Sequence, residues 1–308
     1  MRELIAVGQP IGVKLFSDGV LVIGFSDGDT AAKACGLKEG DIITALGGES
    51  LDTIEELRAC LNANGGSDAE LTVKRGSRTL TLEALPRRDE SGEYRLGAWV
   101  RDSMAGIGTM TFYDPQSGTF GALGHGVTDV DTGKLLPLDH GSIMNASVKA
   151  VKKGEHGAPG ELKGDFDFAR DSGTLYANTE SGIFGKLSAQ DAAALGGKAY
   201  SIAARDEVKT GSATILATVN GNETKEYAIE IEKVYPASGA SRNLLLRVTD
   251  EALLEKTGGV VQGMSGSAIL QNGKLIGAVT HVLLDDSSRG YGIFIENMLD
   301  AAGLSYEA

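Results

Sequence analysis

The sequence predicts a mainly β protein whose amino-terminal part is a smaller α+β domain. Residues 4–85 combine short apolar strands with one amphipathic helix, whereas residues 96–298 hold many short strands of period-two alternation, broken by Gly, Asp and Asn. With 43 glycines and only 6 prolines among 308 residues, the composition is typical of a folded, turn-rich chain. We therefore expect one domain over residues 1–88 and a second over residues 96–308, joined by a charged linker at 89–95.

The amino-terminal domain is expected to contain a short helix, a longer helix and a closing hairpin. Residues 30–37 predict a single helical turn that stops at Gly36. Residues 53–62 predict an amphipathic helix with Asp52 as its cap, because apolar residues recur on one face. Residues 71–82 predict two strands that turn back on each other.

The larger part of the chain is expected to fold as an all-β barrel or sandwich, because its short strands follow one another with frequent turn signals. Gln271-Asn272-Gly273-Lys274 has the composition of a hairpin turn between two apolar strands. Residues 188–195 predict one or two helical turns, and residues 295–302 predict a carboxy-terminal helix.

Charge and composition exclude several classes of function. The net charge of −13 argues against binding to nucleic acid or to an anionic membrane surface. The sequence contains no run of about 18 apolar residues, the length that a transmembrane helix needs. The four histidines are dispersed without a His-Glu-x-x-His motif, and no glycine motif for phosphate or dinucleotides occurs, so we expect no metal and no cofactor.

A serine flanked by glycines marks the first candidate site, in Gly263-Met264-Ser265-Gly266-Ser267. Glycine allows a sharp turn and the close approach of a substrate carbonyl. Such a turn can present the Ser265 hydroxyl and direct the amides of Gly263 and Ser265 at one point, as an oxyanion hole does. The alternative interpretation is a plain surface turn, because Gly-x-Ser-Gly is a short motif.

A histidine among glycines marks a second candidate site about 140 residues upstream, in Leu123-Gly124-His125-Gly126. One histidine at a strand end and one serine in a glycine turn fit a base and a nucleophile that folding brings together. The pair therefore favours covalent catalysis over the surface-turn interpretation.

Three longer segments resemble a known family: residues 124–129, residues 178–185 and residues 258–282. They are similar to the SpoIVB (stage IV sporulation protein B) serine peptidases, PDZ-containing, trypsin-like proteases of spore-forming bacteria. The resemblance covers nearly the whole chain. It implies a PDZ domain over residues 1–88, followed by a trypsin-like double β-barrel serine protease domain over residues 96–308.

The resemblance also implies a role for each site residue. Ser265 corresponds to the nucleophile and His125 to the base, while Ser267 lacks the preceding Gly-x pair that would supply an oxyanion hole. Asp250, fifteen residues before Ser265, corresponds to the acid that orients the histidine. A helix cap is the alternative role for Asp250.

Other side chains are alternatives for these roles. Asp129 follows His125 too closely on a strand to be a natural partner, and Asp165 and Asp167 are weaker alternatives for the acid. His281 lies on the strand after the nucleophile turn, where it either packs or contacts substrate.

In the PDZ domain, the resemblance implies a peptide groove that takes an extended ligand and a terminal carboxylate. The amides that face the carboxylate are expected to be those of Ile11, Gly12 and Val13, with the groove between residues 13–16 and residues 53–62. The alternative is that this segment is only a turn and the domain a spacer.

By resemblance, the chain is a secreted endopeptidase that acts between the forespore and mother-cell membranes. It would cut a regulatory protein that restrains sigma-factor processing, and would also cut itself; the resemblance allows self-association as well. The family's amino-terminal membrane-targeting segment is not found here, which suggests a truncated or processed chain. The competing hypothesis is a non-catalytic PDZ scaffold with a protease-like barrel.

Overall fold

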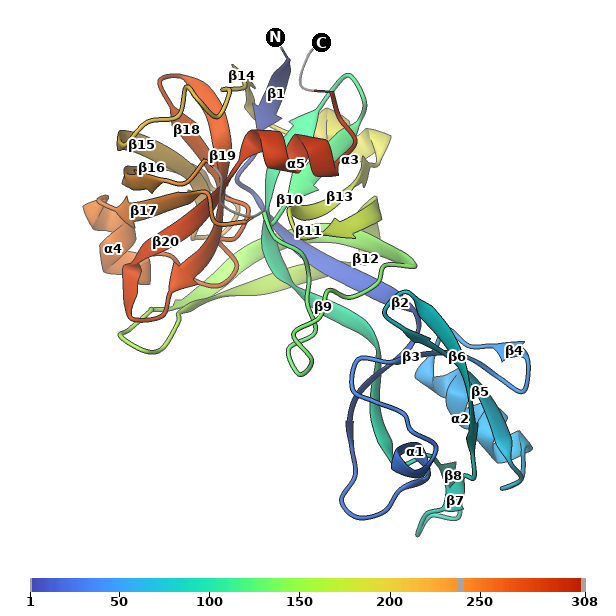
Figure 1. The fold of residues 1–308 in the computed structure, drawn as a ribbon. Coiled ribbons are helices and arrows are strands. Elements are labelled where there is room, and N and C mark those ends of the chain that lie inside the picture. Colours follow the sequence, from blue (N-terminus) through green and yellow to red (C-terminus); the bar gives the residue numbers. More distant parts are fainter. Residues whose placement is uncertain (1, 237–240, 306–308) are drawn as a thin grey trace. The chain divides into compact units, whose positions relative to one another are not determined.

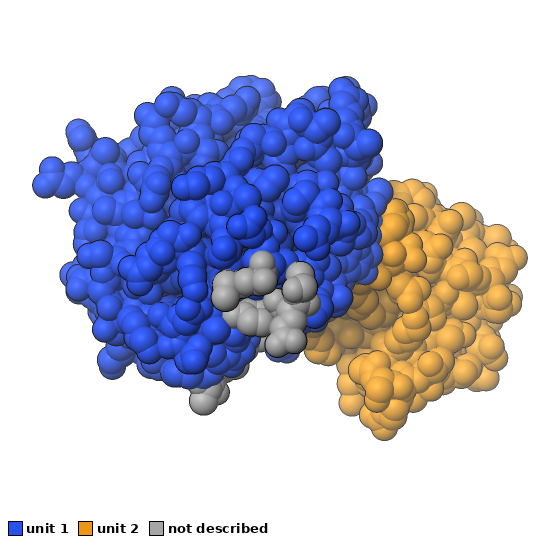
Figure 2. All heavy atoms as spheres, turned by 90° about the horizontal axis from the view of Figure 1, so that it is seen from above, with its two compact units in different colours: residues 1–14, 105–127, 141–308 blue, residues 15–104, 128–140 orange. Residues whose placement is uncertain are grey.

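The computed structural model describes residues 2–236 and 241–305, and the chain separates into two compact units (Figure 2). Unit 1 consists of residues 1–14, 105–127 and 141–308, and unit 2 of residues 15–104 and 128–140. This division differs from the predicted boundaries at 88 and 96 at both ends of the amino-terminal domain.

Strand pairing explains the difference. Strand β1 (Glu3–Ala6) pairs with strands of unit 1, so the first residues do not belong to the PDZ-like unit. The residues predicted as a linker, 89–95, connect and include part of a two-stranded ladder of β7 (Arg87–Arg88) and β8 (Tyr94–Arg95) within unit 2. Residues up to 104 then remain in that unit.

Unit 2 is a small α+β fold in which strands of one sheet share an apolar core with a helix. Thr53, and not the predicted Asp52, caps the longer helix, through a capping box with Glu56. Leu57 and Leu61 on that helix are buried against Val20, Ile43 and the strands beside them. Its elements are α1 (Ala31–Ala34), β3 (Ile42–Leu46), β4 (Glu49–Ser50), α2 (Ile54–Ala63), β5 (Ala69–Arg75) and β6 (Arg78–Ala84).

Two long strands, β2 (Pro10–Phe25) and β9 (Ala98–Asp114), each contain residues of both units. In unit 1, β9 is part of a sheet in which the order of the strands is β14-β1-β9-β10-β13-β12-β11. The remaining strands of that path are β10 (Thr119–Ala122), β11 (His140–Lys152), β12 (Glu161–Thr179), β13 (Gly182–Leu187) and β14 (Lys198–Ser201).

The second half of unit 1 is a closed six-stranded barrel (Figure 1). Its order is β15-β16-β17-β20-β19-β18, and its interior is a cluster of buried hydrophobic side chains. The predicted hairpin turn is confirmed, because Asn272 and Gly273 both have positive φ, as a type I′ turn requires. The strands are β15 (Gly211–Thr218), β16 (Thr224–Val234), β17 (Leu244–Val248), β18 (Ala268–Gln271), β19 (Lys274–Leu283) and β20 (Asp286–Phe294).

Three helices complete unit 1, and the two predicted from the sequence are confirmed. They are α3 (Ala189–Ala194), α4 (Glu251–Thr257) and α5 (Ile295–Ala301). Helix α5 buries Met298 and Leu299 against Ala278 and Ile293 of the barrel strands. Among the described residues, no helix is both long enough and apolar enough to span a bilayer.

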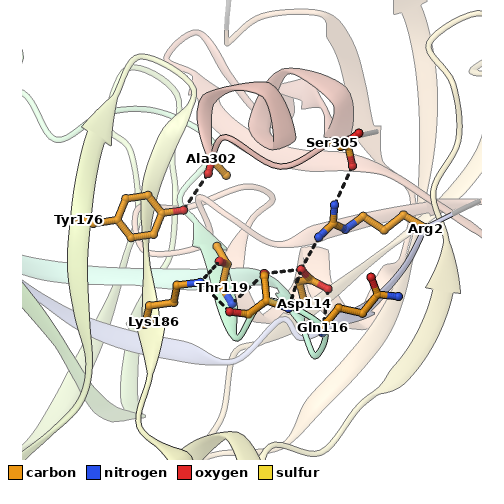
Figure 3. A network of polar contacts seen from close by, with 9 residues as sticks. Arg2, Asp114, Gln116, Thr119, Tyr176, Lys186, Ala302 and Ser305 are labelled. Atoms are coloured by element: carbon orange, nitrogen blue, oxygen red, sulfur yellow. Dashed lines mark hydrogen bonds and ion pairs between the residues drawn. The ribbon is translucent and has the colours of Figure 1, made fainter. Parts of the chain in front are cut away.

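A buried ion pair fixes the amino-terminal end of the chain to unit 1 (Figure 3). The Arg2 guanidinium donates to the Asp114 carboxylate at 2.5 Å and to the Ser305 carbonyl at 2.7 Å. Although burial opposes it, hydrogen bonds from Ser117 and Arg2 hold the pKa of Asp114 below its usual range. Asp114 is fully buried, so its charge depends on these partners.

Asp114→Ala should therefore lower the free energy of unfolding by about 3–5 kcal/mol, because it leaves the buried Arg2 charge uncompensated. Urea unfolding followed by circular dichroism would measure this loss. The matched control is Asp165→Ala, which breaks an exposed ion pair with Lys149 and should cost less than about 1 kcal/mol. Equal losses in the two variants would show that burial of the Asp114 pair is energetically unimportant.

Candidate functional site

The serine turn lies between α4 and β18 and depends on two glycines with positive φ. Gly263 has a φ of +95° and Gly266 a φ of +99°, a region that favours glycine. A Cβ atom at Gly266 would also lie 1.9 Å from the carbonyl oxygen of Thr109. Glycine is thus required at position 266 for both backbone shape and close packing.

Thr109 holds this turn against the strand that leads to the histidine. Its amide donates to the Ser265 carbonyl at 2.9 Å, and its hydroxyl donates to the Gly263 carbonyl at 2.7 Å. Its own carbonyl accepts from the amide of Leu123 at 3.2 Å. The histidine motif at Leu123 and the serine motif at Gly263 and Ser265 are thereby joined through one buried residue.

The two serines of the turn differ in accessibility. Ser265 is partly exposed and its hydroxyl donates to the carbonyl oxygen of Thr280 at 2.6 Å. Ser267 is completely buried, and within the described ranges 2–236 and 241–305 its hydroxyl has no hydrogen-bond partner. Only the Ser265 hydroxyl can meet a substrate without the turn opening.

The two amides predicted to form the oxyanion hole are both unused. The neighbouring amides of Met264 and Gly266 donate to the carbonyls of Val261 and Val279. In the part of the chain that the structure describes, the amides of Gly263 and Ser265 have no such acceptor. Two unpaired donors beside an accessible hydroxyl are what an oxyanion hole needs.

His125 is oriented by the backbone. Its Nδ1 lies 2.8 Å from the carbonyl oxygen of Gly126, which fixes the hydrogen on Nδ1 and leaves Nε2 as an acceptor. The side chain of Asn178 accepts from the amide of Val127 and donates to its carbonyl, so it clamps the backbone just after His125. Burial lowers the pKa of His125, and the bond to Gly126 opposes this shift.

His281 lies beside His125, with 4.8 Å between the ring centroids and 36° between the ring planes. Burial, then the charges of His125 and Arg242, lower the pKa of His281 to about 4. Its Nδ1 is buried and has no hydrogen-bond partner among the residues that the structure describes. Since Thr280, the preceding residue, accepts from Ser265, this strand brings the serine and both imidazoles to one place.

The candidate acids are placed elsewhere. Asp250 is the N-cap of α4 and accepts from the amide of Leu253 at 3.0 Å, which is the helix-cap alternative. Asp129 is buried in unit 2, where it forms an ion pair with Arg101. The structure gives Asp250 no contact with His125, so its role as the orienting acid stays a prediction.

The two weaker candidate acids also have local partners. Asp165 pairs with Lys149 at 2.8 Å, and Asp167 accepts from the amide of Ala169 at 3.1 Å. The group that faces His125 Nδ1 is thus a backbone carbonyl. Sequence reasoning gave no role to that carbonyl, to Thr109 or to Asn178, although Asn178 stands inside one of the three family-like segments.

Comparison with known proteins identifies the family. The profile of the SpoIVB peptidase S55 family matches residues 92–299, about two thirds of the chain. The chain belongs to the SpoIVB peptidase S55 family. A PDZ domain profile matches residues 27–75, all within unit 2. The chain is thus a serine peptidase with a PDZ domain, and the predicted fold class is confirmed.

Other similarities are shorter or more distant. A putative zinc metalloprotease of Clostridium perfringens is 32% identical over 69 residues, which are 22% of this chain and 21% of that protein. The chain thus spans about a fifth of that relative's length. Among the described residues, no group of three or more His, Cys, Asp or Glu side chains could hold a metal ion.

Solved structures also resemble parts of the chain. The Rv3671c protease of M. tuberculosis is 16% identical, with a TM-score of 0.37, over 66% of this chain and 76% of that one. The PDZ domain of an SdrC-like protein from Listeria monocytogenes is 22% identical, with a TM-score of 0.25, over 27% of this chain and 87% of that one.

The structure places the predicted carboxylate-binding segment of this S55 peptidase outside unit 2, which holds the PDZ domain. Ile11, Gly12 and Val13 lie inside strand β2, they are buried, and they belong to unit 1. A Cβ atom at Gly12 would lie 2.6 Å from the side chains of Met144 and Phe166. The glycine therefore serves packing in unit 1, and its amide does not belong to the PDZ domain.

The groove of the PDZ domain lies instead between α2 and the start of β9. A cavity of about 500 Å³ is lined by Leu57 and Leu61 of α2 and by Leu96, Gly97 and Ala98. Leu96-Gly97-Ala98 repeats the apolar-Gly-apolar pattern of Ile11-Gly12-Val13 before a strand. That repetition is the signal in the sequence that could have located the groove.

Asp250→Ala should lower the free energy of unfolding by about 1 kcal/mol, because helix α4 loses its cap, whereas Asp250→Asn should keep it. Thermal or urea unfolding would compare the two variants. Equal destabilisation by Ala and Asn would contradict the capping role. The peptidase activity of Asp250→Asn then tests whether Asp250 is the orienting acid of the triad. Loss of activity in a variant that keeps full stability would establish that role.

The lowered pKa of His125 predicts that kcat/KM rises with pH through a midpoint below 6.5, the ordinary value for histidine. The base must be neutral to accept a proton, and burial keeps it neutral to lower pH. A profile of kcat/KM between about pH 4 and pH 8 would measure the midpoint. A midpoint above 6.5 would show that a negative charge acts on His125.

The same shifts should make the protein less stable in acid. His281 has a folded-state pKa of about 4, below the unfolded value of 6.5, so the unfolded chain binds more protons in this range. The free energy of unfolding should therefore fall as pH drops from about 6.5 to 4, and should fall less in His281→Gln. Urea unfolding across this range, with the exposed His156→Gln as control, tests the assignment; equal slopes in both variants would refute it.

Proposed function

We propose that this chain is a sporulation signalling endopeptidase in which Ser265 is the nucleophile and His125 the base. The observation that carries the proposal is the accessible Ser265 hydroxyl beside the two unpaired amides of Gly263 and Ser265. An oxyanion forms whenever a hydroxyl attacks a peptide carbonyl, and preorganised amide donors stabilise it.

The mechanism follows from the orientation of His125. With its hydrogen on Nδ1 toward Gly126, Nε2 is the atom that accepts the proton of Ser265 and later gives it to the leaving amine. The resulting imidazolium keeps its Nδ1–H bonded to the Gly126 carbonyl, so the backbone holds the ring through the cycle. The acyl-enzyme is then released by water.

The Ser265 hydroxyl must first leave the Thr280 carbonyl, to which it donates at 2.6 Å. Rotation about χ1 between staggered positions is sufficient to redirect a serine hydroxyl. The resting serine is therefore engaged with Thr280, and productive attack begins when it turns to His125.

The family membership supports a substrate and a place for this activity. We propose that the substrate is a regulatory protein that restrains sigma-factor processing, that the enzyme also cleaves itself, and that its PDZ domain recruits peptide segments. The proposed location is the space between the forespore and mother-cell membranes. A non-catalytic scaffold is the competing function, and self-association is compatible with either.

Labelling with a fluorescent fluorophosphonate tests the catalytic proposal. Wild-type protein should be labelled and should cleave a protein substrate, whereas Ser265→Ala should lose both by orders of magnitude, because the nucleophile and base act as a unit. Ser267→Ala is the matched control and should still label. Absence of labelling in correctly folded wild-type protein would favour the scaffold, and labelling of Ser265→Ala would assign the nucleophile elsewhere.

A further inference from the structure

Two hydrogen bonds align helix α2 with residues 94–102 of unit 2, a segment that includes the start of β9. The amide of Ile54, at the start of the helix, donates to the Asp102 carboxylate at 2.9 Å. Near the end of the helix, the Asn62 side chain accepts from the amide of Tyr94, also at 2.9 Å. Residues 94–102 therefore run antiparallel to α2, and the groove lies between the two.

The floor of the groove is apolar and its rim is basic. Leu57, Leu61 and Leu96 form buried parts of the lining. Four arginines and two aspartates also line it, a net charge of +2 in a chain of net charge −13. The charged lining residues are Asp29, Arg58, Arg87, Arg88, Asp89 and Arg95.

Both aspartates of the lining are neutralised. Asp29 pairs with Arg87 at 3.4 Å and Asp89 pairs with Arg95 at 2.9 Å. Arg88 donates to the Gly92 carbonyl, and in the described part of the chain the Arg88 guanidinium forms no ion pair with a carboxylate. Within residues 2–236 and 241–305, Arg58 likewise has no carboxylate partner.

We propose that this groove selects peptide carboxyl termini with an acidic side chain at the third residue from the end, and that Arg58 is the residue that selects it. The inference rests on the proposed recruitment of peptides by the PDZ domain and names the class of peptide. An extended peptide with a free carboxylate and a second carboxylate complements a basic rim over an apolar floor.

The register follows from the spacing of the two elements. Tyr94 binds Asn62 near the end of α2, and Arg87 and Arg88 pair with Arg95 and Tyr94, so these arginines lie at that end of the groove. The terminal carboxylate therefore lies there, and the last side chain faces Leu61. The next side chain of an extended peptide on the same face is two residues away, about 6.8 Å. One helical turn back from Leu61, about 5.4 Å, reaches Leu57 and Arg58.

Fluorescence anisotropy with three labelled peptides tests the proposal on the full-length Ser265→Ala protein, which does not cleave them. The peptides end in Val-Glu-Ala-Val, in Val-Gln-Ala-Val, and in Val-Glu-Ala-Val with an amidated terminus. We expect the Glu peptide to bind about fivefold more tightly than the Gln peptide, as an ion pair at a partly exposed rim contributes. The amidated peptide should bind more weakly than its free counterpart.

Substitutions at Arg58 then assign the preference. Arg58→Gln should bring the Glu and Gln peptides to equal affinity, and Arg58→Glu should reverse their order. Arg78→Glu, an exposed arginine on β6 outside the groove, is the matched charge reversal and should keep the wild-type ratio. A thermal unfolding midpoint like that of wild type confirms that each variant is folded.

Several outcomes would overturn the inference. They are equal binding of the Glu and Gln peptides to the protein with Arg58, a ratio that survives Arg58→Gln, and equal binding of the amidated peptide. Binding of none of the three peptides would overturn both the inference and peptide recruitment by the groove. Fluorophosphonate labelling of wild-type protein is independent of these results, so the catalytic proposal stands or fails separately.

Discussion

The hydrogen bonds of Thr109 are the constraint on which the active site depends. This buried residue contacts the carbonyls of Gly263 and Ser265 on one side and the amide of Leu123 on the other. These bonds hold the carbonyls on either side of Met264, in the turn whose Gly263 and Ser265 amides have no acceptor among the described residues. One residue thus joins the serine turn to the histidine segment.

The local features of the fold could be predicted from the sequence because they depend on neighbouring residues. The turn at Asn272 and Gly273 and the helix at residues 295–301 follow from turn chemistry and apolar periodicity. Ser265 and His125 were predicted for the same reason, since glycine flanks each of them. The Thr109 hydrogen bonds link the turn of Ser265 to Leu123, two residues before His125, and the catalytic roles of the two residues stay a prediction.

The features that could not be predicted depend on pairing between distant segments. Ile11-Gly12-Val13 and Leu96-Gly97-Ala98 have the same pattern, and only the strand partners of each decide which one borders α2. Asp250 likewise fits a cap and a catalytic acid equally well in sequence. The choice between these roles depends on tertiary distance, which periodicity does not encode.

The interleaved order of the two units has a consequence for how the molecule can come apart. The chain passes between them after residues 14, 104, 127 and 140. Segments of the PDZ unit and of the peptidase unit therefore alternate along the sequence. A single nick after residue 104 or after residue 127 leaves both fragments with residues in each unit. Such fragments should co-purify as one particle in native buffer and separate only in denaturant, so a cut alone would not release either activity from the other.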